Sequence, residues 1–416
     1  MSKKAETPKA GDASGRGAVA GYRVNFPARM RTYTEAEIAA VVGVMRNAEV
    51  QTQGACMRQF EADFKAYSGA NHAFAMDNCM NALRVAAILC RIGAGDEVIA
   101  PGYTFCASAI PFGATGAKLV WADIDPETWV VDPRDIEKKI TSRTKVLLVV
   151  HLLGMPADMA AIMKIAEKHG LKVVEDCAQA PGASIRGKKV GTFADFGCFS
   201  FHGAKNITTL GEGGMLVVKS DSDAALAPGL RHDGLRPFPD GRERYWVPAM
   251  TNVDIDIEAV WPNNFCIGEA QCALGSELLK TLDAQNDIVI AQAAKLRTAL
   301  KDIPELKFIK IPEGYRNVFH QFVLHFDGSK FGKNRNDLLD YLTEKAGIRA
   351  IVQYYPLYRY PLFQKLGAGE QRCPVLEDWW DNSFSLPWWI GMPEETLGYL
   401  VDSLKAGIAD LKERKK

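Results

Sequence analysis

The sequence predicts an α/β protein with a large domain around a mostly parallel β-sheet and a smaller α+β domain after it. Between residues 70 and 220, short apolar runs alternate with helix-like stretches, as in βαβ units. After about residue 285 a long helical stretch leads into mixed segments, and 416 residues are too many for one small core. We therefore expect a mobile tail over residues 1–20, a large domain over 21–285 and a small domain over 286–416.

The predicted sheet strands are short apolar segments, each bounded by turn or helix signals. The run 145–151 is apolar throughout, as expected of a strand that is buried on both faces. The helix predicted over 157–169 ends at Gly170, a residue typical of helix C-caps. The predicted strands are 97–100, 118–124, 145–151, 171–176, 196–201 and 214–218.

The C-terminal part has a different pattern. A helical stretch over 288–300 is followed by alternating residues over 320–326, which predict a strand. A helix is predicted over 336–345 and a second strand over 347–353. These segments are expected to form the small domain.

Composition excludes several classes of protein. Fifty basic and fifty acidic residues cancel, so no bulk charge favours nucleic acid or an anionic membrane as a partner. No apolar run approaches the roughly 20 residues of a membrane span, and the N-terminus lacks the apolar segment of a secretory signal. The nine cysteines are scattered, without a CxxC pair or zinc-ligand spacing. We expect reduced thiols, a cytoplasmic protein and no metal site.

Two residues carry the chemical prediction. Asp176 lies at the end of a predicted strand, the edge where open α/β sheets collect ligands. Lys205 lies in a glycine-flanked loop between the last two predicted strands of the sheet. A lysine amine can form a Schiff base with pyridoxal phosphate, and a carboxylate can keep the pyridine nitrogen protonated. The pair therefore predicts a pyridoxal phosphate enzyme, although a lone lysine is usually a solvated surface residue.

An ordered series of motifs then resembles a known family. The motifs are Gly95–Pro101 with Thr104-Phe105, Thr141–Lys145, Val150–Pro156, Glu175–Ala180, the lysine segment ending in Gly211–Gly214, and Asn264-Phe265 before a helix. In this order, over about residues 24–408, they resemble the DegT/StrS-type sugar aminotransferases among the fold-type I pyridoxal phosphate enzymes. The resemblance implies a seven-stranded, mostly parallel sheet flanked by helices.

The resemblance also implies roles for individual residues. Lys205 would hold the cofactor and move the proton, Asp176 would pair with the ring nitrogen, and Gln179 would contact the ring hydroxyl. Phe105 would stack on the ring, and Asn264 of a neighbouring subunit would complete the phosphate site of a homodimer. The other implied phosphate contacts are Ser200 and the helix start Cys79, Met80 and Asn81.

Several of these residues also have simpler interpretations. Asp176 could cap a helix, Phe105 could be a core residue, and Asn264 could cap the helix that follows it. Gln179 and Ser200 could each bond only to local backbone groups.

Two positions depart from the family pattern. Met80 stands where relatives usually have Thr, so a hydroxyl contact to the phosphate is lost. Cys266 stands where relatives tend to have Arg. A sister group that dehydrates sugars has His in place of the lysine. Lys205 argues against that group, although His202 lies three positions away.

The function implied is amino transfer from an amino acid, L-glutamate first, to a keto- or aldehyde-sugar, with pyridoxamine phosphate as the intermediate. Nucleotide-linked hexoses, octulosonates and keto-inositols remain open as acceptors, in amino-sugar or surface polysaccharide synthesis. The alternatives are a cofactor-dependent dehydratase or deoxygenase and a non-catalytic cofactor-binding regulator.

Three further groups of residues have both a functional and a structural interpretation. The arginines of the segment 231–236 could bind a carboxylate or diphosphate, or belong to a solvated loop. The pairs Trp379-Trp380 and Trp388-Trp389 could stack on a sugar or pack between domains. His151 and His202 are expected to be packing or hydrogen-bonding residues.

Overall fold

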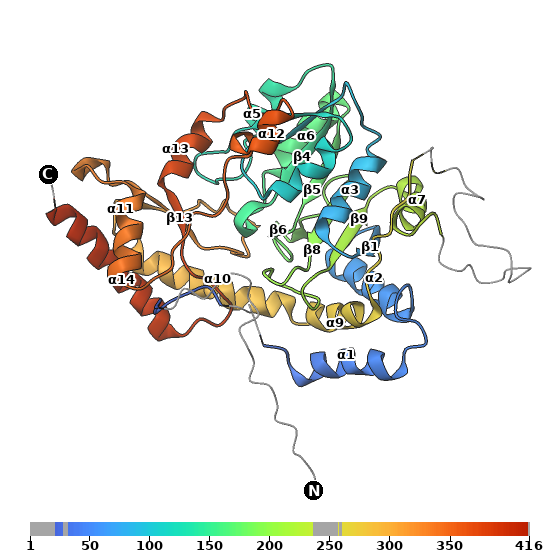
Figure 1. The fold of residues 1–416 in the computed structure, drawn as a ribbon, viewed down its shortest axis with the longest axis horizontal. Helices are drawn as coiled ribbons and strands as arrows, with labels where there is room; N and C mark the ends of the chain where they lie inside the picture. Colours follow the sequence, from blue (N-terminus) through green and yellow to red (C-terminus); the bar gives the residue numbers. More distant parts are fainter. Residues whose placement is uncertain (1–20, 28–31, 236–256, 258–259, 415–416) are drawn as a thin grey trace, which may run out of the picture.

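The computed structural model describes residues 21–27, 32–235, 257 and 260–414 (Figure 1). The tail predicted over residues 1–20 lies outside the described residues. A seven-stranded sheet with helices packed against it lies at the centre of the larger part, so the predicted fold class is confirmed.

Five adjacent strands, β8, β5, β4, β2 and β3, run parallel to one another, while β9 is antiparallel to both of its neighbours, β1 and β8. All six predicted strands are present, with bounds shifted by at most two residues. The sequence analysis missed the edge strand β1. In spatial order the strands are β1 (His72–Met76), β9 (Gly214–Val218), β8 (Phe196–Ser200), β5 (Lys172–Asp176), β4 (Thr144–Val150), β2 (Glu97–Pro101) and β3 (Lys118–Ala122).

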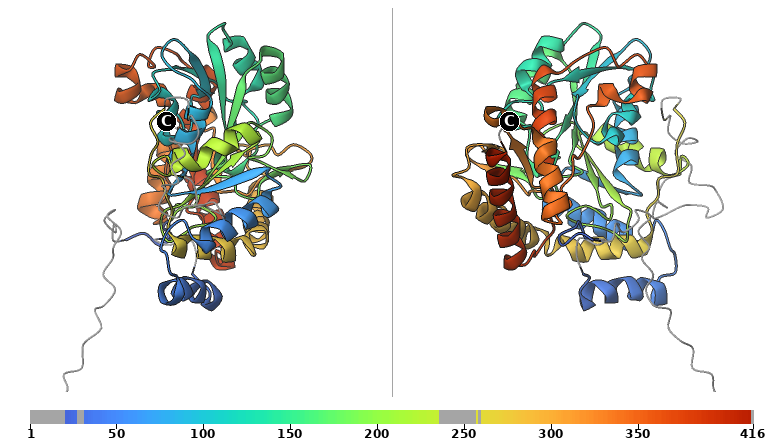
Figure 2. Two further views of the ribbon diagram at one scale, coloured as in Figure 1. Left: turned by 90° about the vertical axis from the view of Figure 1, so that its right-hand side faces the viewer. Right: turned by 60° about the vertical axis from the view of Figure 1, so that its left-hand side comes forward.

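Alternating side chains of β8 and β9 pack into two different cores. Phe199 and Met215 belong to a cluster shared with helices α2 (Ala55–Ser68) and α9 (Glu269–Leu279), whereas Cys198 and Leu216 belong to the main core with helix α3 (Cys79–Leu89). Because successive strand residues point to opposite faces, helices cover both sides of this part of the sheet (Figure 2). The other helices of this part are α1 (Glu35–Asn47), α4 (Ile110–Gly113), α5 (Pro133–Lys139), α6 (Met159–His169) and α7 (Asp221–Arg231).

The long helix α10 (Leu282–Leu300) runs from the large sheet to the C-terminal elements (Figure 1). Because the predicted boundary at 285/286 falls inside this helix, the division into two domains stays a prediction. Two short sheets follow the strand orders β10-β12-β13 and β11-β6-β7. Their strands are β10 (Leu306–Lys307), β12 (Val323–Phe326), β13 (Ser383–Ser385), β11 (Tyr315–Arg316), β6 (Ser184–Ile185) and β7 (Lys188–Lys189); the helices are α11 (Arg335–Asp340), α12 (Pro361–Lys365), α13 (Pro374–Asn382) and α14 (Glu394–Glu413).

The C-terminal predictions are partly wrong. The strand predicted over 347–353 is absent, because the backbone there makes only isolated bridges, from Ile348 to Val24 and from Ile351 to Ser385. The helix predicted over 336–345 is α11 followed by a π-helical turn, Tyr341–Lys345. Within the described parts of the chain, no helix combines the length and apolarity needed to cross a membrane. All nine cysteines are free thiols.

Candidate active site

Asp176 is the last residue of β5 and lies at the carboxyl edge of the parallel strands, as predicted. Its buried carboxylate is held from two sides. The Ser108 hydroxyl donates to Oδ2 at 2.7 Å, and the Ala178 N–H donates to Oδ1 at 2.9 Å. Ser108 Oγ also lies 3.0 Å from Thr104 Oγ1. The sequence analysis missed Ser108, because nothing in the pattern relates it to a partner 68 positions away.

Lys205 lies in the loop between β8 and β9, where its N–H donates to the carbonyl of His202 at 2.9 Å. Burial lowers the pKa of the Lys205 ammonium below its ordinary value, and the neighbouring Asp176 and Cys79 act in the opposite direction. Lys205 and Asp176 are therefore brought together as the sequence predicts. Because the effect of burial is the larger one, this amine loses its proton more readily than a surface lysine, even though the carboxylate beside it holds the proton.

The first turn of α3 lies beside Asp176. Asn78 caps this helix, and its side chain accepts the N–H of Asn81 at 2.9 Å. The Cys79 thiol is buried, with Sγ 4.0 Å from Asp176 Oδ1, and burial raises its pKa well above the ordinary value. Met80 is partly exposed. The Asn81 N–H is thus occupied by the cap, which leaves the N–H groups of Cys79 and Met80 as the ones suited to an anion.

Gly214 allows this helix start to approach the sheet. A Cβ on Gly214 would lie 2.5 Å from the carbonyl carbon of Asn78 and 2.8 Å from the nitrogen of Cys79. Only glycine fits such an approach without displacing the backbone. Gly214 is also the strand partner of Ser200, whose hydroxyl accepts the His202 N–H at 3.3 Å. Ser200 therefore lies at the sheet end that faces the α3 N-terminus.

Gln179 is oriented by two partners. Its Oε1 accepts the Leu153 N–H at 2.8 Å, and its Nε2 donates to the Tyr354 hydroxyl at 3.1 Å. Tyr354 comes from the C-terminal part of the chain, and its ring lies 5.9 Å from that of Phe105. Phe105 is 52% exposed, so it is not the core residue of the simpler interpretation. The sequence analysis missed Tyr354.

Asn264 does not join these residues within its own chain. It is exposed, and its side-chain nitrogen donates to Asp233 Oδ2 at 3.3 Å. It also does not cap the next helix, since α9 begins after Gly268. Gln53 Nε2 donates to Cys266 Sγ at 2.9 Å, so Cys266 contacts a side chain of its own subunit.

Arg231 is a structural residue. Its guanidinium is almost fully buried, pairs with Glu61 at 2.6 Å and donates to the carbonyl of Ala75 at 2.9 Å. This arginine ends α7 and bonds α2 and β1, so for Arg231 both interpretations, anion binding and a solvated loop, are wrong. Arg236, the other arginine of that segment, lies outside the described residues.

Three histidines, His151, His202 and His320, lie in different environments. His151 is fully buried and lies 3.0 Å from Glu175 Oε2, with its Nδ1 accepting the Ala157 N–H. His202 is exposed. His320, which the sequence analysis did not single out, is buried and bonds Asn206 at 3.1 Å. Burial, and then the charge of Lys205, lowers the pKa of His320 well below its ordinary value, so a neutral imidazole neighbours the lysine.

His151, Glu175 and Cys177 are close enough to resemble a metal-ligand group. However, the Glu175 carboxylate already accepts the N–H groups of Gly191, Phe193 and Ala194 in addition to His151. A carboxylate with these four partners has its acceptor sites occupied. The group is therefore better explained as a buried polar network that supports the end of β5.

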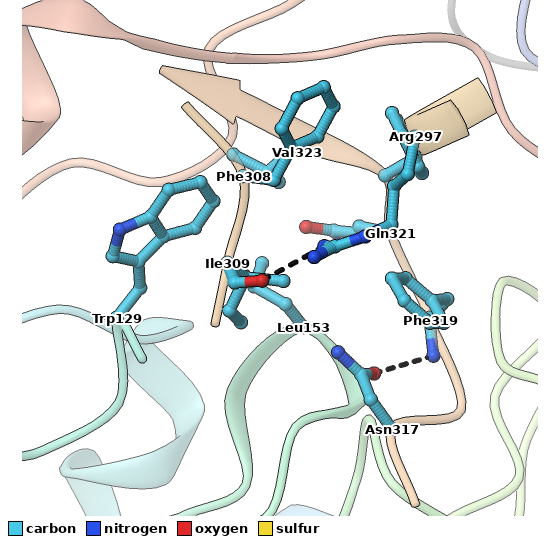
Figure 3. A pocket seen from close by; sticks show the side chains of 10 residues that line it. Trp129, Leu153, Arg297, Phe308, Ile309, Asn317, Phe319, Gln321 and Val323 are labelled. Carbon is cyan, nitrogen blue, oxygen red and sulfur yellow. Dashed lines mark hydrogen bonds between the residues drawn. The ribbon is translucent and has the colours of Figure 1, made fainter. Parts of the chain in front are cut away.

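Figure 3 shows a small cavity whose lining includes Leu153, Asn317 and Phe319. Its volume of about 10 Å³ accommodates at most one water molecule. Leu153, whose N–H orients Gln179, adopts a left-handed φ of 61° here. Neither Lys205 nor Asp176 lines this cavity, which is a packing detail behind Gln179 rather than a ligand site.

The residues present fit pyridoxal phosphate. A buried carboxylate ends β5, a lysine with a lowered pKa lies beside it, and Gly214 makes room for a helix N-terminus that can bind an anion. Together with the seven-stranded sheet, this arrangement defines a fold-type I pyridoxal phosphate aminotransferase.

Comparison with known proteins identifies the family. Residues 31–405 match the model of the DegT/DnrJ/EryC1/StrS aminotransferase family, and the chain belongs to this family. It is 33% identical over 356 residues to the spore coat polysaccharide biosynthesis protein SpsC of Bacillus subtilis, covering 85% of this chain and 90% of that protein. It is 34% identical over 348 residues to a UDP-N-acetyl-3-dehydro-alpha-D-glucosamine 3-aminotransferase of Acidithiobacillus ferrooxidans. This match covers 84% of this chain and 87% of that enzyme.

A solved structure is similar over almost its whole length. The aminotransferase from Psychrobacter cryohalolentis has a TM-score of 0.85 and 27% identity, and the match covers 93% of this chain and all of that one. The protein is thus a pyridoxal phosphate-dependent sugar aminotransferase, and its substrates are an amino acid and a sugar.

Proposed function

We propose that the protein transfers the amino group of L-glutamate to the carbonyl carbon of a nucleotide-linked keto-hexose or a related aldehyde-bearing sugar. The observation that carries this proposal is the placement of Lys205 beside the fixed carboxylate of Asp176, next to the α3 N-terminus. The similarity to an enzyme named for a UDP-linked keto-sugar supports the acceptor class. The similarity to a spore coat polysaccharide protein supports a role in surface polysaccharide synthesis.

Each residue has a proposed role. Asp176 pairs with the cofactor's pyridine nitrogen, Gln179 contacts its ring hydroxyl, and Phe105 covers its ring. Ser200 and the backbone N–H groups of Cys79 and Met80 hold the phosphate. When bound, pyridoxal phosphate serves as an electron sink for the carbon that loses its proton.

Lys205 is proposed to hold the cofactor and then to carry the proton between the donor's α-carbon and the cofactor. A base must be neutral before it can accept this proton. Because burial lowers the pKa of Lys205, a larger fraction of the amine is neutral near pH 7 than for a surface lysine. The neutral His320 nearby adds no competing positive charge.

Uptake of pyridoxal phosphate by the apoprotein is expected to report this lowered pKa. The neutral amine attacks the aldehyde, so the uptake rate rises with pH and levels off once the pH exceeds the pKa of Lys205. The midpoint is expected below the ordinary lysine value of 10.5. Stopped-flow absorbance at a series of pH values measures it, and a midpoint at or above 10.5 would contradict the role of burial.

We also propose a homodimer in which the partner subunit's Asn264 completes the phosphate site. Asn264 is exposed and its side chain bonds Asp233, so it remains accessible to a second subunit. Four large apolar side chains that lie within a few residues of proposed site residues in the sequence are exposed: Met80, Phe105, Leu210 and Trp261. Such exposure is typical of an interface.

Mixed dimers test this arrangement. Lys205→Ala removes the lysine, and Asn264→Ala removes the residue supplied to the other subunit. Each homodimer is expected to be largely inactive. Mixing them should restore up to about one quarter of the wild-type activity, because half of the dimers then carry one intact site of two. Mixtures with no more activity than their components would show that Asn264 acts within its own subunit.

The amino donor is tested by the absorbance spectrum of the purified holoenzyme. Adding L-glutamate is expected to replace the band of the lysine-bound cofactor near the visible edge with the shorter-wavelength band of the aminated cofactor. L-Glutamine and L-alanine serve as comparisons. A spectrum that responds only to one of these compounds would reject glutamate as the donor while leaving the aminotransferase activity intact.

The same experiment separates the alternative functions. A keto-sugar dehydratase or deoxygenase would give no lasting amino sugar product, and a non-catalytic regulator would show no donor reaction. The structure offers support for the transferase, because Lys205 rather than His202 interacts with Asp176. We further propose that the protein works in the cytoplasm, where its free thiols stay reduced.

A further inference from the structure

Three buried polar side chains form a series of hydrogen bonds beside the lysine loop, residues 201–213. Asn206 directly follows Lys205, and its side-chain oxygen Oδ1 lies 3.1 Å from His320 Nδ1. The other side-chain atom of Asn206, Nδ2, donates to Asn286 Oδ1 at 3.1 Å. All three polar residues are buried, Asn286 completely. Because a buried hydrogen bond is costly to leave unmade, this series holds the residue next to the lysine in one place.

The series ends on the turn that follows β5. Asn286 belongs to α10, and its Nδ2 donates to the carbonyl of Pro181 at 2.9 Å. Gly182, with a φ of 86°, permits this approach, since a Cβ there would lie 2.5 Å from Asn286 Nδ2. Pro181 is two positions after Gln179. One amide of α10 therefore connects the lysine loop to the turn that contains Gln179.

The directions of these bonds determine the tautomer of His320. The carbonyl of Pro181 can only accept, so Asn286 donates to it from Nδ2 and accepts from Asn206 at Oδ1. Asn206 thus uses its Nδ2 as the donor, and its Oδ1 can only accept. His320 must therefore donate from Nδ1. In a neutral imidazole this leaves Nε2 without a proton.

The charge state of His320 agrees with this tautomer. Burial, and then the positive charge of Lys205, lowers the pKa of His320 well below its ordinary value, so the ring is neutral near pH 7. The titratable groups that act on Lys205 itself are Asp176 and Cys79. A neutral His320 can hold the lysine loop without adding a charge to this group.

We propose that His320 is a positioning residue for Lys205, which donates a hydrogen bond from its neutral Nδ1–H form to Asn206 and so keeps the lysine beside Asp176. This inference rests on the proposed role of Lys205 in binding the cofactor. A wild-type apoprotein that takes up no pyridoxal phosphate would reject that role and this inference together. Variants of His320 that take up the cofactor as fast as the wild type would reject this inference alone.

Two substitutions separate the hydrogen bond from the ring. His320→Asn places an amide nitrogen near the position of Nδ1, so it can still donate to Asn206, whereas His320→Phe keeps a ring but has no donor. His320→Phe is expected to slow cofactor uptake by about two- to tenfold, the effect of one hydrogen bond. His320→Asn is expected to restore most of this loss. The exposed His169→Asn is the matched control and should behave like the wild type.

A double-mutant cycle tests whether His320 and Asn206 act through one bond. Asn206→Ala is expected to slow uptake about as much as His320→Phe does. The double variant should be no slower than the slower single variant, because the bond can be lost only once. Losses that multiply would overturn the proposal. So would variants whose melting temperatures fall while their uptake rates stay at the wild-type value, because this result would show a role in stability only.

The pH dependence of uptake tests the neutral form of His320. Replacing a neutral ring with the amide of His320→Asn leaves the charge near Lys205 unchanged, so the midpoint should equal that of the wild type. A charged imidazolium would oppose protonation of Lys205, and its removal would raise the midpoint. An upward shift in His320→Asn would therefore overturn the neutral form. A His320→Asn variant as slow as His320→Phe would overturn the positioning role.

Discussion

Replacing Lys205 with alanine is expected to abolish the visible-edge cofactor band and to slow the half-reaction with L-glutamate by at least about 10²–10⁴-fold. This factor is the usual contribution of a positioned acid–base group. The loss follows from the structure, since Lys205 is the buried amine that lies beside Asp176, the last residue of β5. Single-turnover absorbance with excess glutamate measures the rate.

Two matched variants make this result specific. Lys219→Ala removes an exposed lysine directly after β9 and should leave spectrum and rate unchanged. Lys205→Arg keeps the positive charge but cannot readily become neutral, so it should also be inactive. A Lys205→Ala enzyme that retained the wild-type rate would show that another group moves the proton, and His320 would then be the nearest candidate on the structure.

Replacing Asp176 with asparagine is expected to cause the second large loss of reaction rate. The amide has almost the same shape as the carboxylate but no charge, so the charge-assisted pairing proposed for the cofactor nitrogen is lost. A hydrogen bond to a charged group contributes roughly 1.5–3 kcal/mol, which corresponds to a rate loss of about 10–100-fold. The Asp302→Asn variant, an exposed aspartate, should be unaffected.

The same variant makes a prediction about Lys205. The Asp176 carboxylate raises the pKa of Lys205 against the effect of burial, so removing the negative charge should lower that pKa further. The midpoint of cofactor uptake should therefore move to lower pH in Asp176→Asn. A midpoint that stayed in place would mean that the two groups do not interact. Ser108→Ala, which only loosens the carboxylate, should give a smaller rate loss and little change in the midpoint.

The pattern of apolar residues was sufficient to predict most strands of the central sheet. The strands from 97 to 218 are buried apolar runs, and this signal is local, so their positions agree with the structure to within two residues. β1 was missed because His72–Met76 is a short edge strand with two alanines and no β-branched residue, so its strand signal is weak. The strand predicted at 347–353 was wrong because an extended, apolar segment needs a continuous neighbour to become a strand, and only Val24 and Ser385 meet it.

The sequence could point to candidate site residues where the chemistry is carried by one residue type at one place in the motif order. Lys205 and Asp176 belong to this group, and their proximity agrees with the prediction. Ser108, His320 and Tyr354 were not predictable, because their positions depend on contacts between distant segments. Arg231 shows the opposite error, since only its burial against Glu61 reveals that it is unavailable to a substrate.

The sequence by itself determined the class of fold and the family, and it was enough to predict the two residues to which we assign the central chemistry. These depend on local apolar periodicity and on an ordered set of motifs, both of which are written in consecutive residues. Only the tertiary structure decided which groups orient Asp176 and Gln179 and how burial lowers the pKa of Lys205. Hydrogen-bond geometry, desolvation and cavities arise from the packing of segments far apart in the chain, so no local pattern contains them.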